Sequence, residues 1–218
     1  DLGYYSCLYQ NHISTEITTA GRCAFYRISY PQPGRLFIDA SWFLGKDTIP
    51  DKREAQQLVG THVGIVSPTC VEGWSSVRGG WNNGDAYTVY FSLHTDKAFS
   101  VLQSDEQTCR LAFADETVNI KVGISYVSCE KARANIPANT FGQQLATLRA
   151  EWQKMLSRLK YQGTEKNMRM FYTALYHVML MPVNKTGENP KWADSPYYDD
   201  YYAIWDTYRT STPLLGVY

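Results

Sequence analysis

Alternating apolar and polar positions dominate the first 129 residues, with the period of two that is typical of strands lying with one face on a core. The clearest run is 118–126, where Val118, Ile120, Val122, Ile124 and Tyr126 alternate with polar or small residues. Similar runs cover 12–19, 22–30, 58–66, 69–77 and 87–94, and a hairpin turn is predicted at Ala20-Gly21. Turn-forming Gly, Pro and Asn residues separate these runs. An antiparallel β-sandwich is therefore predicted over residues 1–129.

Helical periodicity replaces the alternation after Ser128. Residues 130–135 form a short helical turn that Pro137 ends. A longer amphipathic helix, which Gly163 ends, has apolar residues three and four positions apart, at Leu145, Leu148, Trp152, Leu156 and Leu159. A helix over 165–180 is apolar on nearly its whole surface, which predicts a buried helix, and a third begins near Tyr201. The predicted order is a sandwich (1–129), a helical linker (130–164) and the start of an all-helical domain (165–218).

Composition and charge narrow the class of partner. Lys plus Arg equals Asp plus Glu, at 21 each, so the chain has no basic stripe for nucleic acid and no polybasic segment for anionic lipid. Aromatic residues make up 14% of the chain, with 17 Tyr and 6 Trp, which suits a neutral polar ligand such as a glycan. The longest apolar run, 174–183, is interrupted by polar residues and a proline and is too short to cross a membrane.

The cysteines indicate neither a zinc site nor a redox motif. The five residues, Cys7, Cys23, Cys70, Cys109 and Cys129, are widely spaced and contain no CxxC pair. Buried free thiols are the favoured interpretation, while a disulfide stays open if the protein is secreted. The triplet Asn184-Lys185-Thr186 is a glycosylation sequon, which is weak evidence for secretion.

The last thirty residues hold the main candidate binding site, because they concentrate Tyr, Trp and Asp. Trp205, Asp206 and Arg209 lie on the predicted third helix. An indole face can stack on the C–H surface of a sugar, and a carboxylate can accept hydrogen bonds from its hydroxyls. Asp206 and Arg209 are three residues apart and can instead pair with each other, which spacing alone favours. Trp205 can equally be a core residue.

A second candidate is Trp81, within the segment Val-Arg-Gly-Gly-Trp-Asn-Asn-Gly at 77–84. The two glycines allow a sharp turn that presents the indole on a sandwich loop as a sugar platform. An indole folded back onto the sheet is an equally good interpretation. His177 is interpreted as a core residue of an apolar helix, and the other three histidines have no Cys, Asp or Glu nearby at metal-ligand spacing. Asp194, Asp199 and Asp200 do not match a calcium loop of the EF-hand type. No metal ligand is predicted.

In its motifs the chain resembles glycoside hydrolase family 92, the calcium-dependent exo-acting α-mannosidases. The shared motifs occur in family order: GYYS at 3–6, STEITT at 14–19, VRGGW at 77–81, VGISYVS at 122–128, FYTALYH at 171–177, WDTYR at 205–209 and PLL at 213–215. The segments at 80–84 and 188–192 look most like fungal members, which are typically secreted.

The resemblance implies a β-sandwich joined by helices to an (α/α)6 barrel, with the active site at their junction. It implies removal of terminal α-linked mannose, for which α-1,2 linkages are expected, by calcium-assisted hydrolysis with inversion. By motif, Trp205 and Asp206 would line the pocket for the terminal mannose, Trp81 would reach toward it and Arg209 would orient Asp206. The general acid, the base and the calcium ligands of the family lie downstream of these motifs. This segment is therefore expected to be inactive alone, with no catalytic or metal residue of its own.

The expected partners are a mannose-containing oligosaccharide and the remainder of the chain's own catalytic domain, in a secreted protein that contacts neither nucleic acid nor membrane. A non-catalytic β-sandwich module for glycan binding or domain packing is the alternative. The predicted buried helix at 165–180 argues against that alternative, because a free module would not end in unburied apolar surface. A glycoside phosphorylase of similar architecture is a third possibility.

Overall fold

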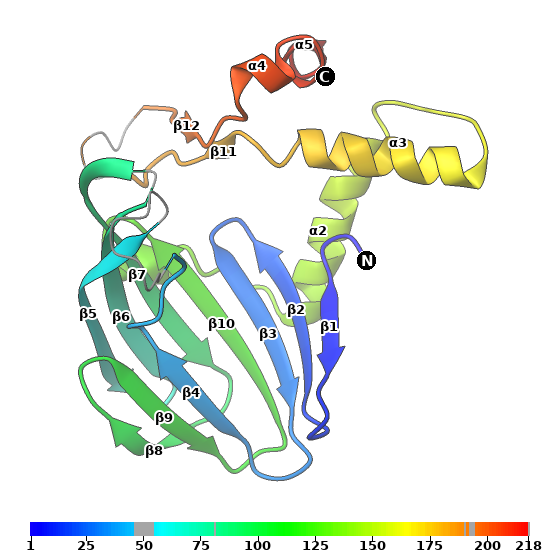
Figure 1. Cartoon of the computed structure of the whole chain (residues 1–218). Coiled ribbons are helices and arrows are strands. Elements are labelled where there is room, and N and C mark those ends of the chain that lie inside the picture. Colours follow the sequence, from blue (N-terminus) through cyan, green and yellow to red (C-terminus); the bar gives the residue numbers. More distant parts are fainter. Residues whose placement is uncertain (46–54, 81, 190, 192–194, 218) are drawn as a thin grey trace. The chain divides into compact units, whose positions relative to one another are not determined.

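The computed structural model describes residues 1–45, 55–80, 82–189, 191 and 195–217. The chain forms two compact units, Asp1–Ala146 and Thr147–Tyr218 (Figure 1). The limits predicted for the helical linker, 130–164, stay a prediction.

A large antiparallel sheet organises the first unit. Within the described residues it has seven strands in the order β1-β2-β3-β10-β7-β6-β5. The strands are β1 (Tyr5–Leu8), β2 (Ser14–Ala20), β3 (Cys23–Ser29), β5 (Gln56–Ser67), β6 (Cys70–Gly79), β7 (Asn82–Thr95) and β10 (Thr117–Ser125). Every predicted strand run falls on one of these strands. The predicted hairpin is confirmed, because Ala20 pairs with Cys23 and Gly21 has a φ of 51°.

A second, smaller sheet packs on one face of the large one (Figure 1). It has the order β4-β9-β8, with bounds Arg35–Asp39, Thr108–Phe113 and Phe99–Ser104. Between the sheets lies a core in which Val71 and Val118 of the large sheet are buried with Cys109 and Leu111 of the small one. The predicted β-sandwich is confirmed. The strands of the small sheet, however, were not among the predicted runs.

Helices cover part of the opposite face of the large sheet. Helix α1 (Cys129–Ala134) lies so close to β10 that a Cβ atom on Gly123 would come within 2.2 Å of the Ala132 carbonyl oxygen. Glycine is therefore required at this contact. The first turn of α2 (Phe141–Leu156) buries Phe141 against Phe25 and Cys23 in a second apolar cluster.

The second unit contains the rest of α2 followed by α3 (Glu165–Val178). Thr164 caps α3, because its hydroxyl accepts the Asn167 N–H at 3.3 Å. The prediction that α2 runs to Gly163 is wrong, since the helix ends at Leu156. The segment that follows packs on α3 instead, with the Tyr161 and Phe171 rings stacked at 5.0 Å and the Tyr172 hydroxyl donating to the Leu159 carbonyl at 3.3 Å.

The apolar stripe predicted for α3 is confirmed. Leu175 is buried, and Met168, Phe171, Tyr172 and Met179 are half-buried. The prediction that the whole helix is buried is wrong for this structure, because on the other side Met170 is 62% exposed and Ala174 is also exposed.

Short elements complete the second unit. They are the ribbon of β11 (Val183–Asn184) and β12 (Tyr198–Asp199), and the helices α4 (Ile204–Thr207) and α5 (Ser211–Val217). Across the described part of the chain, none of the helices combines the length and apolar content that crossing a bilayer needs.

Candidate substrate-binding site

Helix α4 carries the central pair of the predicted site and is anchored at both ends. Ahead of it, the Tyr202 hydroxyl donates to the His177 carbonyl at the end of α3, at 2.7 Å. At its start, the Asp206 N–H and the Thr207 hydroxyl both donate to the Ala203 carbonyl, at 3.2 and 3.1 Å. The Thr207 hydroxyl also meets the Thr212 hydroxyl of α5 at 3.3 Å. The Tyr202 and Thr212 contacts tie to α3 and α5 a helix that is too short to be stable alone.

Both members of the pair face solvent in this structure. Trp205 is 81% exposed and Asp206 is also exposed, so Trp205 is not a core residue of the described chain. Arg209 lies over the Tyr208 ring, with its guanidinium carbon 5.1 Å from the ring centroid. Among the described residues, no ion pair joins Arg209 to Asp206, so the predicted intrahelical pair does not form. An indole and a carboxylate that are adjacent in sequence and both accessible have the chemistry that sugar binding needs.

The other predicted aromatic, Trp81, lies outside the described residues. Its surroundings are described in part: β6 and β7 pair at Gly79 and Asn82, and φ is 91° at Gly79 and 70° at Gly80. The predicted sharp turn at the two glycines is confirmed. The roles of Trp81 and Arg209 in binding substrate stay predictions. Trp192 and Asp194, which belong to the Tyr- and Asp-rich loop, also lie outside the described residues.

In that loop, Lys185 forms ion pairs with Asp199 and Asp200. The Lys185 ammonium lies 2.8 Å from Asp200 Oδ2 and 3.6 Å from Asp199 Oδ2. The Asp200 N–H and the Tyr197 hydroxyl also donate to the Asp199 carboxylate, and together with Lys185 they lower its pKa. Both carboxylates lie at the β11–β12 ribbon and are paired with a cation of the chain itself.

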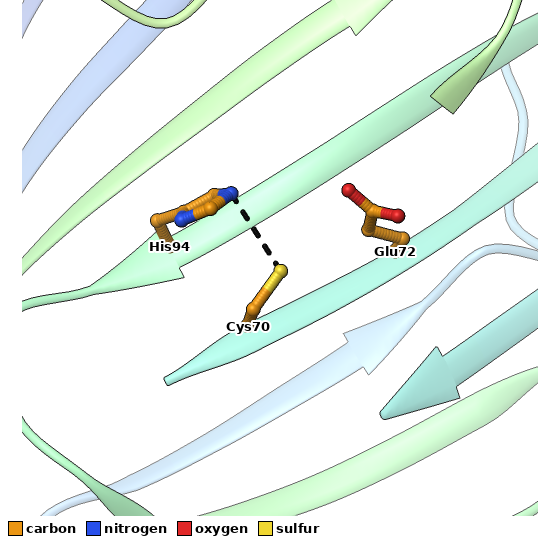
Figure 2. Close-up of side chains that lie close together, drawn as sticks. All are labelled: Cys70, Glu72 and His94. Atoms are coloured by element: carbon orange, nitrogen blue, oxygen red, sulfur yellow. Dashed lines mark hydrogen bonds between the residues drawn. The ribbon is translucent and has the colours of Figure 1, made fainter. Parts of the chain in front are cut away.

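A polar network that sequence reasoning missed lies on the large sheet, on the face toward α1. Antiparallel register places Cys70 opposite His94 (Figure 2). It also places Glu72 opposite Ser92. The Ser92 hydroxyl donates to Glu72 Oε1 at 2.6 Å and lies 3.0 Å from His94 Nε2. Because that hydroxyl has one hydrogen, His94 Nε2 is the donor to the Ser92 oxygen. His94 therefore has Cys and Glu neighbours, which only the register between β6 and β7 reveals.

Arg133 of α1 completes this network. Its Nε and Nη2 atoms donate to the two Glu72 oxygens at 2.9 and 2.7 Å. These bonds are the main cause of a lowered pKa for Glu72, while burial raises the pKa of the Cys70 thiol and lowers that of His94. The bidentate pair ties α1 to the sheet.

The described residues contain no group that fits a calcium ion. Among the described residues, Cys70, Glu72 and His94 are spaced closely enough to bind a metal ion together, because their ligand atoms lie within 4.8 Å of one another. Calcium binds oxygen ligands and not thiols, and here Arg133 already neutralises the carboxylate. We interpret the cluster as a structural network.

The Glu72–Arg133 contact gives a prediction for stability. Because the pKa of Glu72 is lowered in the folded protein, its carboxylate stabilises the fold above its ordinary pKa, and this is lost as pH falls through the lowered pKa. Glu72→Gln is expected to lower the free energy of unfolding at about pH 7 by about 1–3 kcal/mol, a deficit that shrinks toward about pH 3. Urea unfolding at both pH values measures it, with the exposed Glu165→Gln as the control. A deficit that is equal at the two pH values would contradict the ion-pair account.

The first unit has a hollow among its described residues. It has a volume of about 530 Å³ and is lined by residues 30–35 together with Asn11 and Ile13. None of Trp205, Asp206 and Arg209 lines it.

Comparison with known families covers nearly the whole chain. Residues 1–125 match the glycosyl hydrolase family 92 N-terminal domain, and residues 127–218 match the glycosyl hydrolase family 92 catalytic domain. The chain belongs to glycosyl hydrolase family 92. Trp205 and Asp206 therefore lie within the part of this family 92 chain that matches the catalytic domain.

Similar proteins agree with the family and the fold. An uncharacterised secreted glycosidase of Arthroderma benhamiae is 24% identical, over 95% of this chain and 32% of its own length. A family GH92 α-mannosidase of Bacteroides thetaiotaomicron has a TM-score of 0.75 at 22% identity, over 98% of this chain and 33% of its own. A family GH92 inverting mannosidase of the same species has a TM-score of 0.74 at 22% identity, over 97% and 32%. The family 92 chain thus spans about a third of the length of these relatives.

Proposed function

We propose that this chain is the N-terminal part of an exo-acting α-mannosidase. The complete enzyme removes terminal α-linked mannose from glycans, with α-1,2 linkages as the expected substrate, and is secreted or extracellular. Hydrolysis proceeds with inversion and with the help of calcium. Its partners are the mannose-containing oligosaccharide and the remainder of the catalytic domain.

The observation that carries this proposal is the Trp205–Asp206 pair, exposed on an anchored helix within the catalytic-domain match. Related structures support the substrate class: one is named an α-mannosidase, one an inverting mannosidase, and one is a complex of the α-mannosidase with mannoimidazole. The secreted description of the Arthroderma relative supports an extracellular location. The catalytic-domain match over residues 127–218 also favours an enzyme over a non-catalytic sandwich module.

The chemistry assigned to this chain is binding. Trp205 presents an apolar face to the C–H surface of the sugar, and Asp206 accepts hydrogen bonds from its hydroxyls. Inversion requires a carboxylic acid that protonates the leaving oxygen and a separate carboxylate that activates water on the opposite face of the ring. We assign neither group to residues 1–218, and the described residues do not fit a calcium ion. Residues 1–218 alone are therefore expected to bind weakly and not to hydrolyse.

Hydrolysis of α-1,2-mannobiose tests this proposal. We expect a full-length polypeptide that includes this chain to release mannose, first as the β-anomer seen by proton NMR, since inversion changes the anomeric configuration. A calcium chelator is expected to abolish the release and added calcium to restore it, and residues 1–218 alone are expected to show none.

Each possible outcome tests a separate part of this proposal. Failure of the full-length protein on every α-linked mannobiose would contradict the assigned substrate. Release of the α-anomer would contradict inversion, and activity that resists the chelator would contradict the role of calcium. Turnover by residues 1–218 alone would show that a catalytic pair was missed in them.

A further inference from the structure

We propose that Asn184 is a site of N-linked glycosylation. Asn184-Lys185-Thr186 is the one Asn-x-Ser/Thr triplet in the sequence, so the chain offers a single candidate site. Its central residue is Lys and not Pro, and Gly187 follows the Thr. The proposal rests on entry into the secretory pathway, which is itself proposed above.

The local structure presents this asparagine to solvent. Asn184 is the second residue of β11 and is exposed, whereas its neighbour Val183 is half-buried. The Asn184 Oδ1 atom accepts the Thr186 N–H at 3.0 Å, an Asx turn that places the asparagine side chain beside the residue that defines the sequon. The chain then turns at Gly187, whose φ is 74°. An exposed side chain at a turn tolerates a bulky substituent.

The strand opposite offers a surface for the first sugar. Tyr198 of β12 pairs directly with Asn184 across the ribbon and is 48% exposed. Directly paired residues of antiparallel strands have their side chains on the same face, so the apolar face of the Tyr198 ring is available for a sugar on Asn184 to pack on. The ribbon itself is tied by the Lys185 N–H to the Tyr197 carbonyl at 2.7 Å, and by the Tyr197 N–H to the Thr186 hydroxyl at 3.0 Å.

The modification is a transfer from an oligosaccharide linked to a lipid through a diphosphate, catalysed by the host's membrane transferase. The Asn184 amide nitrogen forms a bond to the anomeric carbon of the first sugar, and the bond from that carbon to the diphosphate oxygen breaks. The lipid diphosphate leaves with the electron pair, and the amide nitrogen loses one proton.

The test expresses the chain behind a host secretion signal in a eukaryotic cell and treats it with peptide N-glycosidase. We expect one shift to lower mass and conversion of Asn184 to Asp, detected by peptide mass spectrometry. Asn184→Gln and Thr186→Val are expected to abolish the shift, whereas Thr186→Ser keeps the hydroxyl and retains it.

Asn189→Gln is the matched control. Asn189 forms the same kind of Asx turn, with its Oδ1 atom 2.8 Å from the Lys191 nitrogen, but it is not part of a sequon. The control is expected to leave the shift unchanged. An unshifted protein in the medium or the membrane fraction, or a shift that survives Asn184→Gln, would overturn the proposal. Neither result depends on mannosidase activity, which a separate assay measures.

Discussion

Replacing Asp206 by Asn in the full-length protein is expected to lower kcat/KM for α-1,2-mannobiose by about 100-fold. Asparagine keeps the shape of the side chain but loses its charge. A hydrogen bond to a charged group contributes about 1.5–3 kcal/mol, so the weakening of two such bonds accounts for a change of this size. Asp206 is exposed and α4 is held by other contacts, so the far-UV circular dichroism spectrum is expected to stay unchanged.

Companion variants separate sugar binding from folding. Trp205→Phe keeps an aromatic face and is expected to retain more activity than Trp205→Ala, mainly through a smaller rise in KM. Asp115→Asn removes a half-exposed carboxylate in the first unit, 3.3 Å from Lys97, and is expected to leave both kinetic constants unchanged. If Asp206→Asn and Asp115→Asn behaved alike, the assignment of Asp206 to the sugar pocket would be wrong.

Leu111→Ala is expected to destabilise the sandwich by about 2–5 kcal/mol. Leu111 has no exposed surface and lies in the core between the two sheets, so its truncation removes buried apolar surface and leaves a cavity. Urea unfolding, followed through the β-sheet signal in far-UV circular dichroism, measures the change as a lower midpoint at an unchanged slope.

The matched control is Leu102→Ala on the neighbouring strand β8. Leu102 is 54% exposed, and its truncation is expected to change the free energy of unfolding by less than about 0.5 kcal/mol. Equal effects of Leu111→Ala and Leu102→Ala would show that the small sheet does not pack on the large one as described.

The sequence predicted the large sheet well and the small sheet poorly. Residues 118–126 alternate cleanly because one face of β10 meets the core and the other meets α1. The strands β4, β8 and β9 are short, and on β8 the alternation fails because only Phe99 is buried. The sequence of β9 does show the alternation that predicts a strand, because buried Cys109, Leu111 and Phe113 alternate with Arg110 and Ala112.

Contacts between distant residues could not be predicted from local pattern. The Glu72 and Arg133 side chains are 61 positions apart in sequence and meet only because α1 lies on the sheet. After α2 ends at Leu156, the Tyr161 ring packs on Phe171 and the Tyr172 hydroxyl bonds to the Leu159 carbonyl, contacts that helix propensity does not encode. For the candidate site, spacing alone favoured an Asp206–Arg209 pair, yet Arg209 packs on Tyr208 instead.

A crystal structure of the full-length protein with mannoimidazole would show whether Trp205 and Asp206 bind the terminal mannose. We expect an Asp206 carboxylate oxygen within about 2.6–3.2 Å of a hydroxyl of the bound ring, and the Trp205 indole in contact with the sugar. A ligand bound elsewhere, with Trp205 and Asp206 both facing bulk solvent, would contradict this expectation.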